Sequence, residues 1–230
     1  PHPRVNRGPL AGVKVVELAG LGALPYGSLR LADMGAEVIR VERTADVPDE
    51  PVAKAHSAWD RGRRSVAVDL KQADGVETVL RLADTADVFV EAFRPGVVDR
   101  LGVGYEAVSK RNPRIVYCSI AAFGQTGPYS DRAGYDYAIQ GMGGLMSVTG
   151  ERDDLGGGPQ KVGVAVADLF TGMYATVAVL AALTVREQSG EGQHIDLSLL
   201  DAQVAMLANQ NMNYLTTGIA PARAGNAHPN

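Results

Sequence analysis

The sequence predicts an α/β fold: a Rossmann-like parallel sheet with helices on both faces. Short valine- and isoleucine-rich runs alternate with helical segments, and the runs are apolar almost throughout. Glycine and proline separate the two kinds of segment. The chain has 230 residues, of which 46% are hydrophobic, so it can bury the core of one large domain. We therefore expect residues 1–230 to form a single large α/β domain.

The alternation is clearest in the first half of the chain. Strands are expected at 13–18, 37–41, 65–68, 87–91 and 114–120. Helices are expected at 25–34, 72–85 and 105–111. The first helix carries Pro25 in its first turn and Gly35 at its end, which suits both residues.

The second half contains longer helices and loops. Helices are expected at 169–187 and 198–216, and loops at 44–64, 122–134 and 149–163. A loop as long as 44–64 is more often a binding element than a passive linker. The segment 162–185 is apolar enough to resemble a membrane span, but Asp168 and several threonines interrupt it. We expect a buried helix of a soluble core instead.

Composition excludes several function classes. The formal net charge of -4 argues against general nucleic-acid binding. A single cysteine, Cys118, permits no intrachain disulfide and favours a reducing, cytoplasmic location. The first nine residues lack the apolar core of a signal peptide. No Cys/His cluster has metal-ligand spacing, so we expect no metal site.

The glycine-rich turn after the first strand could bind a nucleotide. Residues 19–27 read AGLGALPYG, and Glu42 ends the second strand where an acid could hold a ribose. A dinucleotide fingerprint needs a third glycine where Pro25 stands. We therefore favour a tight turn over an NAD site, although a helix amino terminus at this edge suits an anionic ligand.

Basic residues gather around the expected strands. They are Arg40 and Arg43 near the exit of the second strand, Arg61, Arg63 and Arg64 before the third, Lys71 after it, and Arg94 after the fourth. Because strand exits meet at one edge of a parallel sheet, we expect these cations to converge there. Guanidinium groups pair bidentately with phosphate oxygens, so the cluster favours a phosphate-bearing ligand over ordinary surface charge.

Asp168 is a carboxylate inside the apolar run 163–172, GVAVADLFTG. One interpretation is an ordinary N-cap at the start of the following helix. The other is a nucleophile. The helix dipole and free N–H groups are expected to keep the carboxylate ionised, and an ionised carboxylate can attack a thioester. The two interpretations are compatible.

A second candidate site is the pair Tyr135 and Asp136, which precedes the glycine cluster 141–144. Glycines let the backbone approach a ligand closely, but a plain turn beside a short helix explains them equally well. The histidines are His2, His56, His194 and His228. None has a paired acid at helical spacing, so we expect His194 to be structural and none to act as a general base.

Seven motifs in order resemble a known family. They are residues 8–18 (GPLAGVKVVEL), 32–42 (ADMGAEVIRVE), 61–71 (RGRRSVAVDLK), 91–97 (EAFRPGV), 123–129 (FGQTGPY), 134–136 (GYD) and the Asp168 segment. Each motif alone is loose, but the ordered set is specific. The sequence is similar to the amino-terminal portion of family III coenzyme A transferases, the CaiB–BaiF family.

The resemblance implies a large CoA-binding domain and a homodimer whose chains interlock. It implies that Asp168 attacks an acyl-CoA thioester, that CoA captures the resulting anhydride as an aspartyl-CoA thioester, and that a carboxylic acid then takes the CoA. It assigns contacts with CoA to Arg40, Arg61, Arg64, Leu70, Lys71, Arg94, Tyr135 and Asp136. Acyl-CoA is then a substrate, and no cofactor is bound permanently. Small dicarboxylates such as succinate are the expected acyl source.

Two departures from the family pattern keep alternatives open. Related 2-methylacyl-CoA racemases carry a histidine where this chain has Tyr135, and tyrosine, with a reference pKa of about 10, is a poor base at neutral pH. The family's chains also continue beyond 225–230, so the small domain is expected to be missing here. The alternatives are a racemase or epimerase, a CoA-binding fragment without catalysis, and a dinucleotide-binding domain.

Overall fold

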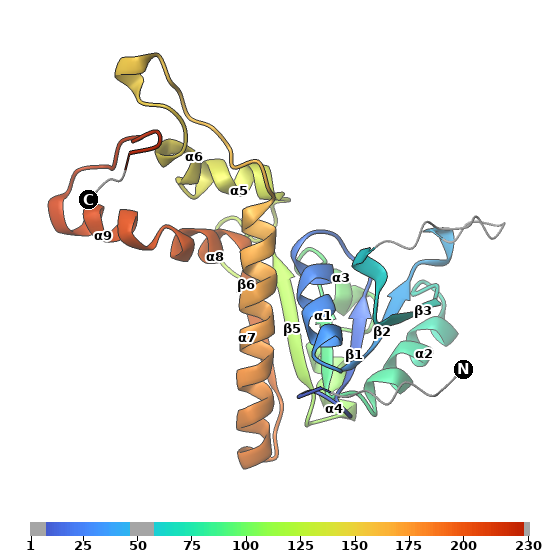
Figure 1. Ribbon diagram of the computed structural model, residues 1–230. Coiled ribbons are helices and arrows are strands. Elements are labelled where there is room, and N and C mark those ends of the chain that lie inside the picture. Colours follow the sequence, from blue (N-terminus) through green and yellow to red (C-terminus); the bar gives the residue numbers. More distant parts are fainter. Residues whose placement is uncertain (1–7, 47–57, 228–230) are drawn as a thin grey trace.

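The computed structural model describes residues 8–46 and 58–227, which contain one six-stranded parallel sheet (Figure 1). Its strand order is β3-β2-β1-β4-β5-β6. The strands are β1 (Lys14–Leu18), β2 (Glu37–Glu42), β3 (Arg63–Ala67), β4 (Val88–Glu91), β5 (Val116–Ala121) and β6 (Gln193–Ser198). This order reverses direction between β1 and β4, as in doubly wound nucleotide-binding folds. The predicted fold class is confirmed.

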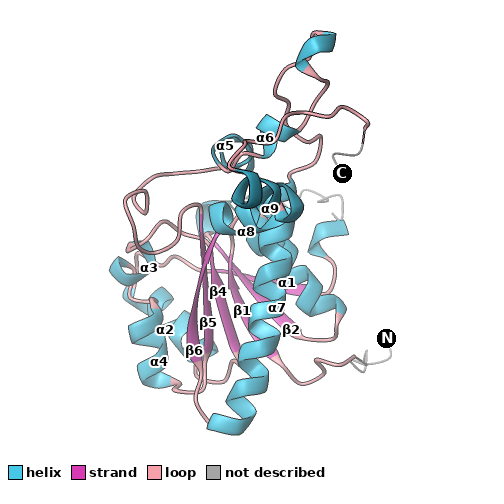
Figure 2. Cartoon of the chain, turned by 90° about the vertical axis from the view of Figure 1, so that its left-hand side faces the viewer, coloured by secondary structure: helices cyan, strands magenta, loops and turns pink. Residues whose placement is uncertain are grey.

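Helices cover both faces of the sheet (Figure 2). They are α1 (Ala23–Asp33), α2 (Ala73–Ala83), α3 (Val97–Arg100), α4 (Tyr105–Arg111), α5 (Asp136–Met142), α6 (Leu145–Val148), α7 (Val166–Ser189), α8 (Leu199–Met206) and α9 (Ala208–Thr217). In Figure 2, α1 and α7 lie on one side of the strands, and α2, α3 and α4 lie on the other. Short 3₁₀ turns occupy Thr44–Asp46, Ala58–Asp60 and Asp153–Leu155.

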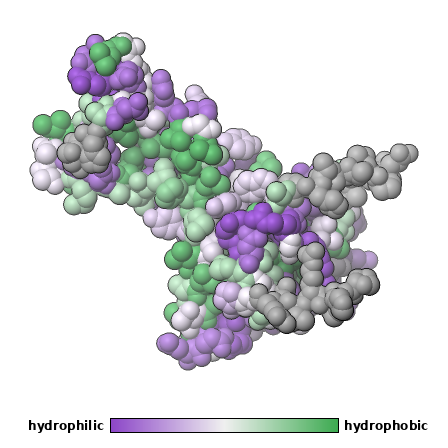
Figure 3. All heavy atoms as spheres, viewed as in Figure 1, coloured by the Kyte–Doolittle hydropathy of each residue, from purple (hydrophilic) through white to green (hydrophobic). Residues whose placement is uncertain are grey.

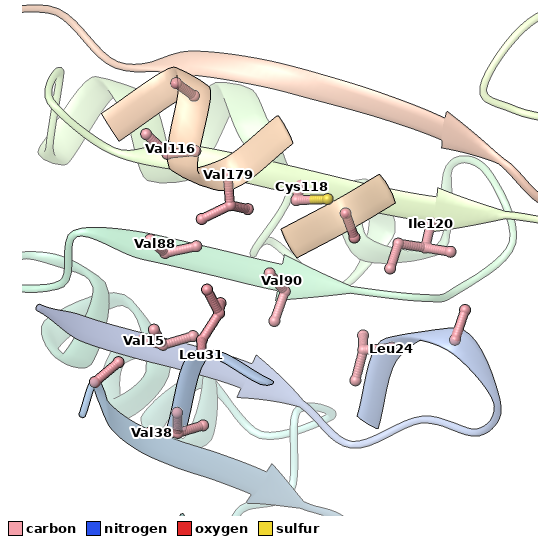
Figure 4. Close-up of a cluster of buried hydrophobic side chains, with 14 of the residues drawn as sticks. Val15, Leu24, Leu31, Val38, Val88, Val90, Val116, Cys118, Ile120 and Val179 are labelled. Atoms are coloured by element: carbon pink, nitrogen blue, oxygen red, sulfur yellow. The ribbon is translucent and has the colours of Figure 1, made fainter. Parts of the chain in front are cut away.

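The two-residue period of the strands divides the core into two layers. Val15, Val88 and Val90 pack beneath α1 and α7, with Leu31 and Val179 contributed by those helices (Figure 4). The residues that alternate with them in the strands pack beneath α2 and α4. These are Val16, Leu18, Phe89 and Tyr117, together with Val79, Ala83 and Val108 from the helices. Burial on both faces explains why the central strands are continuous apolar runs.

The structure differs from the expected elements most clearly at β6 and at the helix expected over 198–216. The edge strand β6 (Gln193–Ser198) was not expected, because its exposed positions are polar and hide the strand pattern. The single helix expected at 198–216 is wrong. The chain breaks at Ala208, which has φ 34°, and the Asn211 side-chain amide donates to the Val204 carbonyl at 2.6 Å. This hydrogen bond replaces one that a continuous helix would have made.

Helix α7 is long and apolar enough to cross a membrane by length and composition alone. In this structure it packs against α1, α8, β5 and β6, and it buries Ala175, Val179 and Ala182. This packing agrees with the expected core helix. The helix begins at Val166, earlier than expected, so Asp168 lies inside its first turn.

Helices α5, α6, α8 and α9 form an arm that projects beyond the carboxyl ends of the strands (Figure 1). Apolar side chains gather on the surface of this arm (Figure 3). The large hydrophobic residues exposed on α7 and along α9 are Phe170, Met173, Tyr174, Val177, Val185, Met212, Tyr214 and Leu215. The described part of the chain therefore leaves an extensive apolar surface uncovered.

Candidate active site

Helices α1 and α7 cross unusually closely because two glycines meet at their contact. A Cβ on Gly27 would lie 2.9 Å from the Gly172 carbonyl oxygen, and one on Gly172 would lie 2.6 Å from the Ala23 carbonyl oxygen. Any larger side chain would push the helices apart. Asp168 precedes Gly172 by about one helical turn, so this contact brings Asp168 against the amino end of α1.

The Asp168 carboxylate fills the space above Gly22. Gly22 has φ 67° and ψ -118°, a conformation that side chains other than hydrogen disfavour. A Cβ there would lie 2.6 Å from Asp168 Oδ1 and 2.7 Å from its Cγ. The carboxylate accepts a hydrogen bond from the backbone N–H of Ala23, the first residue of α1. The glycine turn of the sequence therefore makes room for a carboxylate.

Asp168 opens into a cavity of about 530 Å³ at the carboxyl ends of β1, β4 and β5. The cavity lies where the strand order reverses, which is the usual ligand position in open parallel sheets. Its floor and walls combine small apolar residues with cations. Its lining residues include Gly22, Arg43, Arg94, Ile120, Ala122, Arg132, Tyr135, Asp168 and Leu199.

Asp136 caps the helix that carries Asp168. Its Oδ1 accepts the backbone N–H of Ala167 at 2.7 Å and that of Asp168 at 3.2 Å. Its Oδ2 accepts from the Gln140 side chain at 2.5 Å. Asp136 is absent from the described lining of the cavity, and its expected contact with CoA stays a prediction. Its role here is to satisfy the free N–H groups of α7.

The pKa of Asp168 is raised to about 6, first by burial and then by the negative charge of Asp136, while the Ala23 hydrogen bond opposes the rise. The expectation that Asp168 is itself an N-cap is wrong, and so is the expectation that the helix N–H groups hold it ionised. Asp136 occupies those N–H groups instead. At neutral pH the carboxylate is still mostly ionised, and it is less stabilised than a solvated carboxylate, which favours nucleophilic attack.

Three arginines line the cavity. Arg43 follows β2 and also pairs with Asp46 at 2.8 Å. Arg94 follows β4, as expected from the sequence, and Arg132 comes from the loop between β5 and α5. Arg132 follows no strand directly, so the sequence pattern does not single it out. The lining thus presents three cations against one carboxylate, which favours an anionic ligand.

Two of the other predicted cations, Arg61 and Arg64, do not converge at this edge. Arg61 pairs with Asp33 through two hydrogen bonds of 2.9 and 2.7 Å, and Arg64 reaches Glu37 at 3.4 Å. Glu37 begins β2, so Arg64 lies at the amino ends of the strands, opposite the cavity. The expected convergence of Arg61 and Arg64 is wrong, because Arg61 precedes β3 and Arg64 lies at its amino-terminal start.

Arg40 lies within β2 and joins a partly buried ion-pair network. Its guanidinium is 3.7 Å from Glu17 and 3.5 Å from Asp60. The centre of that network is the fully buried Glu17, whose Oε2 accepts from Arg63 at 2.8 Å and from Ser28 at 2.6 Å. These contacts fix the Ala58–Asp60 turn to the sheet, and Arg40 is outside the described cavity lining.

Leu70 and Lys71 follow β3, two strands away from β1. Leu70 packs against the hydrophobic layer beneath α2, and the backbone N–H of Lys71 donates to Asp69 at 2.9 Å. Neither residue lines the described cavity. Their expected contact with CoA therefore stays a prediction.

Tyr135 does line the cavity, and 73% of its surface is exposed. His194 lies in β6, hydrogen-bonds Ser119 at 2.9 Å and stacks on Tyr105, as expected of a structural histidine. The remaining histidines, at positions 2, 56 and 228, lie outside the described residues.

The position of Asp168 also argues against a dinucleotide site. In a dinucleotide fold the pyrophosphate binds the amino end of the first helix. Here the Asp168 carboxylate accepts the Ala23 N–H at that end. A second anion in the same place would be repelled, so the α1 amino terminus is reserved for Asp168.

Comparison with known proteins supplies close relatives. A family profile described as "CoA-transferase family III" matches residues 10–230. The chain is 51% identical to a succinate–glutarate CoA-transferase of Agrobacterium fabrum, a match that covers 96% of this chain and 58% of that protein. It is 41% identical to the human succinyl-CoA:glutarate CoA-transferase, covering 97% and 52%. The chain thus spans a little over half the length of these relatives.

Solved structures agree with these sequence matches. A CaiB/BaiF family protein from Brucella suis superposes with a TM-score of 0.88 at 47% identity, and the match covers 97% of this chain and 61% of that one. A Mycobacterium tuberculosis protein superposes with a TM-score of 0.81 at 34% identity, covering 94% and 61%.

Proposed function

The chain belongs to CoA-transferase family III, and we propose that it moves CoA from an acyl-CoA to a carboxylic acid through a covalent intermediate on Asp168. The observation that carries this proposal is the Asp168 carboxylate, which stands half-buried in a cation-lined cavity at the carboxyl edge of the sheet. Relatives named as CoA-transferases support the reaction class.

In the first half-reaction an Asp168 oxygen attacks the thioester carbonyl. The C–S bond breaks, CoA leaves as a thiolate, and a mixed anhydride forms. The thiolate then attacks the Asp168 carbonyl carbon, which releases the donor acid as a carboxylate and leaves CoA joined to Asp168 as a thioester. Burial of Asp168 favours these reaction steps. The carboxylate bears a desolvation cost in the folded protein, and the neutral anhydride and thioester do not.

The second half-reaction reverses these steps with a different acid. The acceptor carboxylate attacks the aspartyl thioester and expels CoA thiolate. The thiolate then attacks the acceptor carbonyl of the new anhydride, which forms the product thioester and returns Asp168 as a carboxylate. No proton or electron is gained or lost over the cycle, so the site needs neither a general base nor a redox cofactor.

The arrangement of the cavity suggests how CoA lies in it. Arg43 follows β2 and Arg94 follows β4, the two strands that flank β1 in the sheet. Guanidinium groups bind phosphate oxygens well, and these two residues are our candidates for the CoA phosphates. The CoA thiol would then point toward Asp168.

We expect Arg94→Ala to weaken CoA binding by about 10- to 100-fold, because a charge-assisted contact is worth about 1.5–3 kcal/mol. Arg64→Ala is the matched control, since Arg64 is exposed and pairs with Glu37 at the opposite end of the strands. Calorimetric titration with CoA measures both. Equal losses in the two variants, or none in Arg94→Ala, would contradict this placement.

The substrates we propose are small dicarboxylic acids. The relatives named above act on succinate and glutarate by their names, and others are named for oxalate and mesaconate. Each of these acids has two carboxylates. A cavity with three arginines suits an acid whose second carboxylate remains charged after the first has formed the thioester.

The direct test of this function is a transfer assay. The protein is incubated with succinyl-CoA and glutarate, and glutaryl-CoA is measured. The racemase alternative is tested with a 2-methylacyl-CoA in deuterated water, where racemisation requires deuterium to enter the α-carbon. We expect transfer without α-exchange, because Tyr135 stands where the racemases carry a histidine. Exchange without transfer would establish the alternative.

The rate should fall in acid because only ionised Asp168 is a nucleophile. Since its pKa is raised to about 6, kcat/KM should increase with pH up to about 6 and level off above it, which gives an acid limb in the pH profile. Asp136→Asn removes the neighbouring negative charge but keeps an oxygen for the α7 N–H groups, so the limb should move to lower pH. A remote Asp154→Asn variant should leave it in place, and an unshifted limb in Asp136→Asn would contradict the coupling.

We also propose that two copies of the chain associate as an interlocked homodimer. The exposed apolar residues of α7 and α9 support this proposal, because a second copy could cover them. Molecular mass in solution tests it directly.

A further inference from the structure

Arg132 is a cation that the proposed chemistry of CoA binding leaves unused. Arg43 and Arg94 lie toward β2 and β4, while Arg132 belongs to the loop between β5 and α5. Along the edge of the sheet, the β5–α5 loop therefore lies on the far side from the β2 end. A ligand that spans the cavity would meet Arg43 after β2 at one side and Arg132 after β5 at the other, with Arg94 after β4 between them.

The loop holds Arg132 in a built position. Its guanidinium carbon lies 4.1 Å from the centre of the Tyr129 ring, and Tyr129 packs edge-on against Phe123 at 5.5 Å. The loop is tied to the strands at its start, where the Gln125 N–H donates to Asp196 at 3.0 Å and the Leu200 N–H donates to the Ala122 carbonyl at 3.1 Å. A cation fixed on an aromatic ring is pre-organised for a ligand.

Arg132 also lacks an internal counter-charge. Within residues 8–46 and 58–227, most arginines form ion pairs with a carboxylate, including Arg61, Arg64 and Arg111. Arg132 has no such partner among those residues, although it lines the same cavity as the carboxylate of Asp168. Small apolar residues, Ile120, Ala122 and Leu199, line the cavity as well and suit a short methylene chain.

We infer that Arg132 binds the second, non-reacting carboxylate of a dicarboxylic acyl group whose first carboxyl is joined to CoA at Asp168. This inference rests on the proposed function for the identity of the thioester. It adds a binding subsite, with Arg132 as the residue that selects dicarboxylates over monocarboxylates. Arginine suits this role because its planar fork pairs bidentately with a carboxylate.

The test compares two thioesters of equal chain length, glutaryl-CoA and pentanoyl-CoA. Glutaryl-CoA ends in a carboxylate, whereas pentanoyl-CoA ends in a methyl group. Affinities are measured by calorimetry in an Asp168→Asn background, which prevents consumption of the thioester. We expect this background to bind glutaryl-CoA more tightly than pentanoyl-CoA.

Adding Arg132→Ala should weaken glutaryl-CoA binding by about 10- to 100-fold while leaving pentanoyl-CoA and free CoA within about threefold. Arg132→Lys should restore part of the preference, because the charge remains but the fork is lost. Arg81→Ala, an exposed arginine on α2, is the matched control and should change nothing. Equal losses for glutaryl-CoA, pentanoyl-CoA and CoA would overturn the subsite and make Arg132 a contact to CoA.

Failure of the subsite and failure of the proposed function give different results. A protein that transfers CoA but binds the two thioesters equally keeps its function and loses the subsite. A protein that prefers glutaryl-CoA through Arg132 but transfers no CoA keeps the subsite and loses the function.

Discussion

Replacement of Asp168 by asparagine should lower the rate of CoA transfer by about 1,000-fold or more, as expected for removal of a nucleophile. Asparagine keeps the shape of the side chain but not its charge, and an amide oxygen does not form the anhydride. The stability of the folded protein should not fall, because burial raises the pKa of Asp168 and so disfavours its charged form. We therefore expect a melting temperature equal to or above that of the wild type at pH 7.

The sign of that stability effect follows from linkage. A pKa raised to about 6 means that the folded state binds this proton more tightly than the unfolded state. The resulting stabilisation is present below the ordinary aspartate pKa and is lost as the pH rises through about 6. At pH 7 the neutral amide of Asp168→Asn avoids this loss of folding stability. The control is Asp74→Asn on the exposed surface of α2. Wild-type turnover by Asp168→Asn, with deamidation excluded by intact mass, would contradict the mechanism.

Gly22→Ala should lower activity by about 100-fold, because even a displacement of about 1 Å at a reacting group has an effect of that order. The new methyl group would lie 2.6 Å from Asp168 Oδ1 and would have to displace the carboxylate. The variant should also lose stability, by about 1–3 kcal/mol, since Gly22 has φ 67°. Steady-state kinetics and thermal unfolding measure the two effects separately.

Gly12→Ala is the matched control for Gly22→Ala. Gly12 has φ 92°, so alanine is strained there too, but no atom lies within 4 Å of the added Cβ. We expect a loss of stability without a comparable loss of kcat. If both variants lost activity in proportion to their stability, the close approach of Gly22 to Asp168 would have no part in catalysis.

The fold was largely predictable because buried parallel strands have a strong sequence signature. The runs that became β1, β4 and β5 are buried on both faces almost throughout, and the helix at Tyr105–Arg111 was predicted with its observed bounds. β6 escaped prediction because it is an edge strand whose exposed side chains are polar. The break at Ala208 escaped because it depends on a side chain, Asn211, that supplies the missing hydrogen bond.

The candidate site was predictable residue by residue but not as an arrangement. Asp168 could be singled out as a carboxylate in an apolar run, whereas its cap, Asp136, lies 32 residues away and reaches it only in the folded chain. Arg94 follows a strand and was expected at the edge. Arg64 lies at the start of β3, so the direction of that strand places it at the other end of the sheet. Arg132 gave no local signal because a ring contact with Tyr129 positions it.

The central claim is that Asp168 becomes covalently joined to CoA. It is tested most directly by mass spectrometry of the protein after incubation with succinyl-CoA in the absence of an acceptor acid. We predict an added mass equal to CoA less one water, located on the peptide that contains Asp168 and removed by hydroxylamine. The Asp168→Asn variant should gain no mass. An unmodified wild-type protein that still transfers CoA, or an adduct that persists in Asp168→Asn, would contradict the account.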